Sequence, residues 1–174
     1  KHSSDLQLSL NAELVGPRKN RIPADNGYNV QKWWFDAEGK HVDDQLITAQ
    51  QGQLFTVVIQ VNKTSENRDG DVLITDLLPA GFEIEDALVA PPSLSSVGVY
   101  HESDVEPDYQ ANMDDRFVAH FANRLYLNDN ILLSYVVRSA YTGEVQIGGA
   151  HIEHMYAPEV NGRSGSFRAL VIEK

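Results

Sequence analysis

Two histidines stand three residues apart in the 174-residue chain, at His151 and His154. Imidazole nitrogens bind metal ions, so the pair raises the possibility of a metal site. The flanking residues indicate a strand, in which positions three apart point to opposite faces of the sheet. The helical zinc pattern His-Glu-x-x-His is absent, because the order here is His-Ile-Glu-His. We therefore expect two solvated strand histidines and no metal site.

A second candidate cation site is the acidic stretch "HESDVEPDYQANMDDR" at 101–116. Calcium binds several carboxylate and carbonyl oxygens at once, so such a stretch could collect an ion. No EF-hand spacing is present, and "NRDGD" at 67–71 lacks the closing glutamate. We expect a solvated acidic loop, with Arg116 fixed by a carboxylate where the next strand begins. The acids concerned are Glu102, Asp104, Glu106, Asp108, Asp114 and Asp115.

Nucleophilic catalysis finds little support among the residue types. The chain has no cysteine, which excludes a thiol nucleophile and cysteine-ligated metals. The stretch "GRSGS" at 162–166 departs from the nucleophile elbow Gly-x-Ser-x-Gly at its last position. Acids are plentiful, but abundance alone does not indicate the paired carboxylates of a glycosidase. We predict neither enzymatic activity nor a cofactor.

Trp33 and Trp34 are adjacent, so on a strand one side chain faces the core and the other faces outward. The outward tryptophan could form a surface contact, either as a platform for a ligand or against a neighbouring domain. Alternatively, a loop covers it. Both remain open from the sequence.

The elements that carry these residues alternate apolar and polar side chains with a period of two, which is typical of half-buried strands. The excursion at 90–112, "APPSLSSVGVYHESDVEPDYQAN", is irregular and is expected to hold one short strand or helix at most. Short turns join the strands; in "LPAGF", Pro79 is expected at the first corner and Gly81 at the exit. The pattern predicts an all-β, antiparallel, two-sheet sandwich of about eight strands. Its expected strands lie in the stretches 6–10, 29–36, 53–62, 71–79, 116–122, 131–141, 144–155 and 166–173.

Length and charge limit the classes of protein. With 42% hydrophobic residues, residues 1–174 fit a single domain. The net charge of −11 disfavours nucleic acid and anionic lipid surfaces as partners. No apolar run reaches the about 18 residues of a membrane helix, so we expect no membrane insertion of this segment. The first residue is Lys1 and no signal peptide precedes the strands, so we expect a processed product or a piece of a longer protein.

Three stretches resemble the carboxy-terminal macroglobulin-like domain of bacterial alpha-2-macroglobulins. They are "ITDLLPAGFEIE" (74–85), "DDRFVAHF" (114–121) and "AYTGEVQIGGAHIEHMYAPEVNGRS" (140–164), in that order along the chain. The resemblance runs from about residue 5 to 172, with Gly148 and Gly149 in place of expected prolines. It implies a macroglobulin-like sandwich at the carboxy-terminal end of a large, multi-domain periplasmic or envelope protein.

The resemblance also implies a function. In that family a protease cuts a bait region, the molecule rearranges, and a Cys-Gln thioester in another domain captures the attacking protease. The loop matching Met155 and Tyr156 covers the thioester in the resting state, with Pro158 stiffening its exit and Gly162 turning the chain back. The implied partners are the thioester-bearing and other macroglobulin domains of the parent and, through the whole protein, target proteases.

Three alternatives stay open at this point. The Met-Tyr pair would be only an inter-domain contact if the parent lacks a reactive thioester, or it would simply plug the end of its own sandwich. In a different functional class, the chain would be an independent ligand-binding or adhesion sandwich that holds a glycan or peptide through an exposed tryptophan or an open sheet edge.

Overall fold

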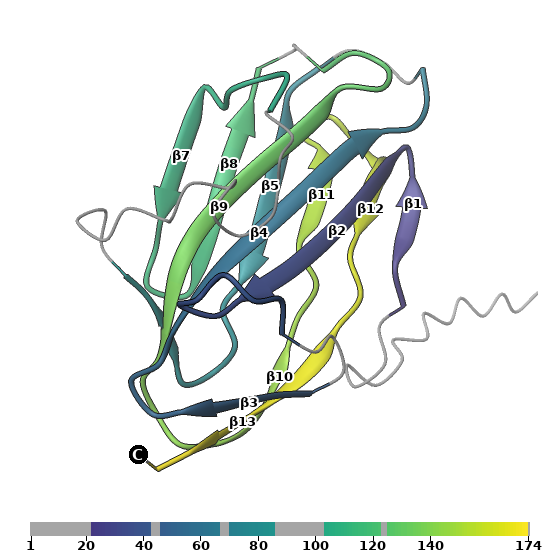
Figure 1. Ribbon diagram of the computed structural model, residues 1–174. Helices are drawn as coiled ribbons and strands as arrows, with labels where there is room; N and C mark the ends of the chain where they lie inside the picture. Colours follow the sequence, from purple (N-terminus) through teal and green to yellow (C-terminus); the bar gives the residue numbers. More distant parts are fainter. Residues whose placement is uncertain (1–21, 43–45, 67–69, 86–102, 123–124, 174) are drawn as a thin grey trace, which may run out of the picture.

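The computed structural model describes residues 22–42, 46–66, 70–85, 103–122 and 125–173 (Figure 1). These residues form strands and no helix, so none of them makes a helix that could span a membrane. The strands are β1 Ala24–Asn26, β2 Tyr28–Phe35, β3 Leu46–Gln50, β4 Leu54–Lys63, β5 Val72–Leu77, β6 Phe82–Ile84, β7 Tyr109–Asn112, β8 Arg116–Phe121, β9 Asn130–Ser139, β10 Gly143–Ile147, β11 His151–His154, β12 Ala157–Arg163 and β13 Phe167–Ile172. They are more numerous than the expected eight for two reasons: the stretch 144–155 is divided in two, and β1, β3, β6, β7 and β12 lie outside the eight expected stretches.

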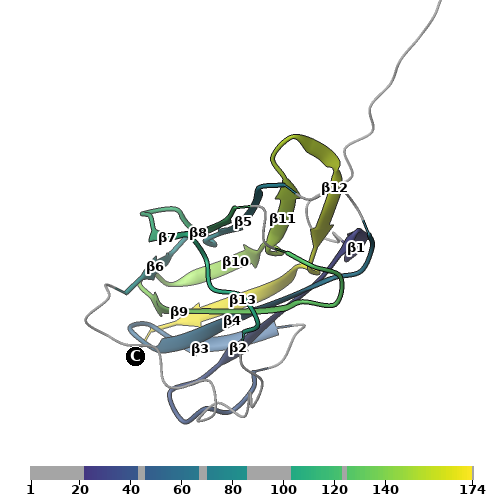
Figure 2. The ribbon, with the colours of Figure 1, turned by 90° about the horizontal axis from the view of Figure 1, so that it is seen from above.

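Two antiparallel sheets face each other across the core. A six-stranded sheet has the order β1-β12-β11-β5-β8-β7, and a four-stranded sheet has the order β2-β4-β9-β6. Figure 1 looks onto β2, β4 and β9 with the larger sheet behind them, and Figure 2 shows the two layers from above. The predicted all-β antiparallel sandwich is confirmed.

A small third sheet continues the larger one. β10 leads directly into β11, and β12 leads into β13; both connections break the ladder, at Gly148–Ala150 and at Ser164–Ser166. β13 pairs antiparallel with β10 on one side and parallel with β3 on the other, and this parallel pair departs from the expected antiparallel pairing. Because β3 and β13 are far apart in sequence, their direction is set by packing on the shared core and not by a hairpin turn.

The core follows from the period of two. Inward positions of β4 and β9 are almost fully buried, and Trp34 is enclosed by Phe55, Phe82 and Phe167, with ring centroids 5.4–6.1 Å apart. Residues from all three sheets belong to one continuous core cluster, among them Ile47 of the small sheet. Burial of this apolar area is the main source of stability.

One ion pair is buried inside this core. Lys32 of β2 and Asp76 of β5 occupy inward positions, with side chains 1% and 0% exposed, and Lys32 Nζ lies 2.7 Å from Asp76 Oδ1. Lys32 Nζ also donates to the carbonyl of Gly148, at 3.2 Å, and Tyr135 Oη donates to Asp76 Oδ2, at 2.6 Å. The pair therefore joins β2 of one layer to β5 of the other, and it makes further hydrogen bonds to β9 and to the β10–β11 connection.

The Tyr135 hydroxyl is held in its neutral form. Burial and the neighbouring Asp76 carboxylate raise the pKa of Tyr135 well above its usual value of 10.0. The ring of Tyr135 on β9 stacks on the ring of Phe117 on β8, with 4.6 Å between centroids. This contact joins the two layers next to Asp76.

The structure tests the predictions made for Arg116 and for Pro79 in the β5–β6 turn. Arg116 is fixed at the start of β8 by a two-pronged contact with Asp115, at 2.9 and 2.6 Å, as expected, and this contact lowers the pKa of Asp115. In the β5–β6 turn, Phe82 N donates to the Pro79 carbonyl and Gly81 has φ +85°, so Pro79 precedes the first corner instead of occupying it.

The remaining predictions concern irregular segments. The expected strand at 6–10 lies outside the described residues, as does most of the excursion at 90–112; its described end carries the short strand β7. Gly162 lies inside β12 and not at a turn. Glycine is needed at this position because a Cβ would lie 2.1 Å from the Tyr28 carbonyl oxygen of β2. The expectation that Gly162 turns the chain back was wrong.

The buried ion pair yields a first prediction. Asp76→Ala leaves the Lys32 ammonium without its counter-charge, and removing one partner of a buried pair costs about 3–5 kcal/mol. We expect a loss of that order in the free energy of unfolding of the 174-residue chain, measured by urea denaturation. The double variant Lys32→Met/Asp76→Leu removes both charges and should recover part of the loss. A double variant no more stable than D76A would contradict this account.

Tyr135 yields a second prediction, on pH. Unfolded tyrosine ionises near pH 10 while folded Tyr135 stays neutral, so its contribution to stability is present below that pH and is lost as pH rises toward the folded-state pKa. Above about pH 10, the wild-type chain should lose up to ~1.4 kcal/mol per pH unit more than Tyr135→Phe. At neutral pH, Y135F should be less stable by about 1–3 kcal/mol because Asp76 loses a buried hydrogen bond. Urea denaturation across the alkaline range tests this; equal pH slopes would refute it.

Candidate functional site

The residues at the turn between β11 and β12 form the most exposed apolar feature of the described chain. Met155 and Tyr156 make the turn, with 48% and 79% of their surface exposed, and Tyr156 is the most exposed large hydrophobic residue among those described. The β11–β12 loop projects beyond the rest of its sheet in Figure 2. We call Met155 and Tyr156 the hairpin tip.

The hairpin tip stands on a rigid base. β11 lies inside the six-stranded sheet, paired with β12 on one side and with β5 on the other. The Met155 amide donates to the Asp71 carbonyl at 2.8 Å, which ties the tip to the residue preceding β5. The tip is therefore presented by the centre of a sheet and not by a free loop.

The buried side chain of His154 holds the backbone of the turn in place. Its side chain is 4% exposed, and its Nδ1 accepts a hydrogen bond from the Tyr156 amide at 3.2 Å. The ring lies against Gly70, where an added Cβ would come 2.3 Å from Nε2. Two solvated histidines were expected, and for His154 this was wrong: it shares its face of β11 with buried Ile152. His151 points to the opposite face, as predicted for positions three apart.

The exit of the turn is widened by an irregular register. His154 pairs with Ala157, but the next pair is Glu153 with Asn161, so three residues of β12 have no counterpart on β11. Pro158 is the first of these residues and is exposed, and its carbonyl accepts a hydrogen bond from Asn161 Nδ2 at 2.8 Å. The bulge broadens the surface next to Tyr156.

The side chains of Trp33 and Trp34 point to opposite faces of β2, as the alternation predicts. Trp34 is the inward residue and is 1% exposed, so it contributes to the core and not to a surface contact. Trp33 faces the other side of β2, half-buried against Phe35, Val58 and Leu132. Any surface contact of this pair would have to be made by Trp33.

Some of the acids and serines singled out from the sequence have structural partners. Asp104 Oδ2 accepts a hydrogen bond from the Asn130 amide and Asp108 Oδ2 one from the Ala122 amide, while Asp114 and Glu106 are exposed; Glu102 lies outside the described residues. Ser164 is buried and its Oγ accepts from the Ala150 amide. Among the described residues, no three metal-ligating side chains come together.

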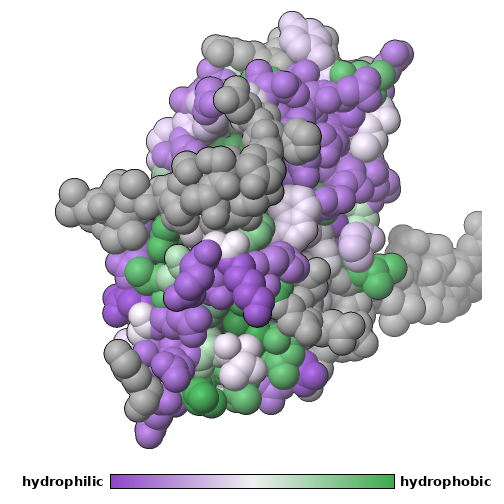
Figure 3. Space-filling model, viewed as in Figure 1, coloured by the Kyte–Doolittle hydropathy of each residue, from purple (hydrophilic) through white to green (hydrophobic). Residues whose placement is uncertain are grey.

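A second apolar surface lies at the opposite end of the molecule. Leu46, Leu170 and Ile172 are each about 40% exposed on the outer side of β3 and β13. Figure 3 shows a largely hydrophilic face over β2, β4 and β9, with hydrophobic surface gathered toward the end that holds β3 and β13.

Sequence reasoning missed the residues that hold the site in place. Lys32 and Asp76 were passed over although each lies in phase with buried neighbours, Val30 and Trp34 in one case and Val72 and Ile74 in the other. His154 shares the phase of Ile152 in the same way. An ionisable residue in phase with a buried stripe is a usable signal for a core polar group.

Known proteins share the sequence pattern and the fold of this domain. The sequence model of the bacterial alpha-2-macroglobulin MG10 domain matches residues 27–159. The chain is 29% identical to the alpha-2-macroglobulin of Escherichia coli (strain K12) over 180 residues, which covers 98% of this chain and 10% of that protein. The chain thus spans about a tenth of the relative it matches.

Solved structures agree with this similarity. The fold superposes on trypsin-activated alpha-2-macroglobulin from Escherichia coli with a TM-score of 0.69 and 26% identity, covering 87% of this chain and 11% of that one. It also superposes on Salmonella alpha-2-macroglobulin reacted with methylamine, with a TM-score of 0.69 and 25% identity, covering 89% and 10%.

The His154 contact yields a third prediction. Asparagine carries an oxygen at the position of the histidine Nδ1, so His154→Asn keeps the acceptor for the Tyr156 amide, whereas His154→Leu removes it. A net hydrogen bond of about 1 kcal/mol corresponds to roughly fivefold faster amide exchange. We expect this acceleration at Tyr156 in H154L and near wild-type exchange in H154N, measured by NMR after correction for intrinsic rates. Equal acceleration in both variants would assign the effect to lost ring packing alone.

Proposed function

Because the chain belongs to the MG10 domain family of bacterial alpha-2-macroglobulins, we propose that it is a non-catalytic domain of a protease-trapping protein. In this proposal, its hairpin tip packs over a thioester in a neighbouring domain and keeps the trap in its resting state. The observation that carries the proposal is the presence of Tyr156, 79% exposed, at the end of a hairpin rooted in the middle of a sheet.

The chemistry of a thioester explains why such a cover is needed. A thioester reacts with water and amines, so it survives only where both are excluded. A flexible thioether and a broad aromatic ring together cover an irregular surface with little polar character. Met155 and Tyr156 supply these two side chains, and both are exposed.

The thioester itself must come from another domain. The chain contains no cysteine, so the labile bond cannot form within it. Support for such a partner comes from the relatives: the Salmonella protein has been solved after reaction with methylamine, and the Escherichia coli protein after activation by trypsin. These are the two kinds of reaction that a protease trap with a shielded thioester undergoes.

The organisation of the parent follows from the same proposal. In this proposal, residues 1–174 form one macroglobulin domain at the carboxy-terminal end of a longer chain; the Escherichia coli relative is about ten times as long as this chain. Its partners are the other macroglobulin domains and the thioester domain of that chain, and target proteases meet it only through the whole protein. The proposed location is the periplasm or cell envelope, where such proteases arrive.

The proposal yields a fourth prediction. In the full-length parent, Tyr156→Gly should uncover the thioester and accelerate its inactivation by methylamine, because the aromatic cover is lost while the turn's backbone contacts remain. The rate is measured as the appearance of a free thiol after adding methylamine. The matched control is Tyr126→Gly, which removes a tyrosine that is 69% exposed in a different loop and should leave the rate unchanged.

Two outcomes would count against the proposal. If Y156G and Y126G react at the wild-type rate, the hairpin tip is a structural contact without a shielding role. If the parent releases no thiol at all, the tip cannot cover a thioester. Circular dichroism of the 174-residue chain carrying Y156G should match the wild type, since Tyr156 makes no part of the core.

A further inference from the structure

The large sheet splits next to β10. β5 pairs with β11 from Val72 to Thr75, which lies opposite His151. Beyond that point, Asp76 and Leu77 pair only with β8, while β10 pairs only with β13 among the described strands. Within the described part of the chain, one edge of β10 is therefore unpaired, and it faces the place where a continuing β5 would have lain.

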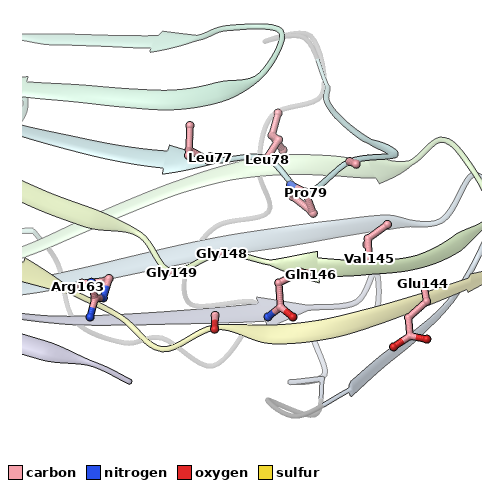
Figure 4. Close-up of a pocket in the computed structure, with 11 residues that line it drawn as sticks. Leu77, Leu78, Pro79, Glu144, Val145, Gln146, Gly148, Gly149 and Arg163 are labelled. Carbon is pink, nitrogen blue, oxygen red and sulfur yellow. The ribbon is translucent and has the colours of Figure 1, made fainter. Parts of the chain in front are cut away.

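A pocket of about 520 Å³ fills this split, within the about 300–1,000 Å³ typical of ligand sites. Figure 4 shows its two sides: residues 77–80 on one, and β10 with the two glycines that follow it on the other. The lining residues are nearly consecutive on both sides, as expected when backbone edges and not single side chains form the walls. The hollow has the form of a slot for an extended chain.

The chemistry of the slot is uneven along its length. Leu77, Leu78, Pro79 and Val145 make its wall apolar, and Leu77 is 54% exposed. At the end near Gly149, the Nε of Arg163 and the hydroxyl of Ser166 are buried without a hydrogen-bond partner among the described residues. The Arg163 guanidinium also donates from Nη2 to the Ile22 carbonyl at 3.1 Å, which leaves Nε and the Ser166 hydroxyl as donors for an acceptor on a ligand.

Among the described residues, the unpaired edge of β10 is guarded by neither proline nor lysine. Natural edges are guarded by proline, by lysine or by covering segments. The sequence from Gly143 to Gly149 has neither proline nor lysine, and a Cβ placed on Gly148 would meet nothing within 4 Å. Its one charged residue, Glu144, is engaged by Arg168 of the adjacent strand, at 3.0 Å.

We propose that an extended segment of the parent protein, outside these 174 residues, adds to β10 as a further strand. Its backbone pairs with the open edge, an aliphatic side chain enters the slot against Leu77 and Pro79, and a carbonyl or carboxylate oxygen faces Arg163. Strand addition of this kind takes its affinity from main-chain hydrogen bonds and its specificity from a side-chain pocket. The occupant belongs to the parent because the matched relatives are about ten times longer than this chain, which leaves many segments covalently held nearby.

Photo-crosslinking in the full-length parent tests this inference. The photoreactive residue p-benzoylphenylalanine is placed at Leu77, an exposed position on the slot wall, and the cross-linked peptides are identified by mass spectrometry. The same residue at Glu38, exposed on a turn after β2, is the control for chance encounters. We expect cross-links from position 77 to converge on one segment of the parent beyond residues 1–174, and those from position 38 not to reach that segment.

Gly148 provides matched variants that separate strand addition from simple proximity. Gly148→Lys places a charged guard at the open edge, and Gly148→Ala adds only a methyl group where space is free. The cross-link from position 77 should be lost in G148K and retained in G148A. Cross-links that fall within residues 1–174, that are absent, or that persist in G148K would overturn the proposal. The readout does not involve the hairpin tip, so it is independent of thioester shielding.

Discussion

The Lys32–Asp76 ion pair is the constraint on which the rest of the structure depends. It sits in the core where the large sheet splits, and Lys32 donates to the Gly148 carbonyl on one side of the split while holding Asp76 on the other. The backbone pairing of β5 with β11 ends at Thr75, and β10 does not pair with β5. The buried ion pair links the two sides where this backbone pairing is missing. Burying two charges is not in itself stabilising. Its effect is to fix one arrangement: β10 bends away, while β11 stays paired and runs on to the hairpin tip.

This arrangement determines how the tip is presented. A two-residue turn at the end of an isolated hairpin would move with its own fluctuations, since a hairpin alone is marginally stable. Here the hairpin is rooted between β5 and β1, and its turn is bound twice, by the Asp71 carbonyl and by His154 Nδ1. The apolar tip can thus meet a partner surface with little conformational entropy still to lose.

The sequence predicted the layers well and the site only in outline. Alternation in β4, β8 and β9 fixed which residues face the core, because side chains on a strand must alternate. It could not reveal that Lys32 and Asp76 face each other, since contact across the sandwich depends on how the two sheets are stacked. Nor could it show that His154 is buried, because that depends on Gly70 approaching from a distant loop. The position of Met155 and Tyr156 at a turn came from resemblance, and their exposure from the structure.

Among the residues that depart from the ordinary rule of polar outside and apolar inside, two pairs do so for different reasons. Lys32 and Asp76 are charged and buried, but each finds its partners within the domain, which makes their role architectural. Met155 and Tyr156 are apolar and exposed, and nothing in the described domain covers them. In the proposed resting state, a surface outside the domain covers the ring of Tyr156.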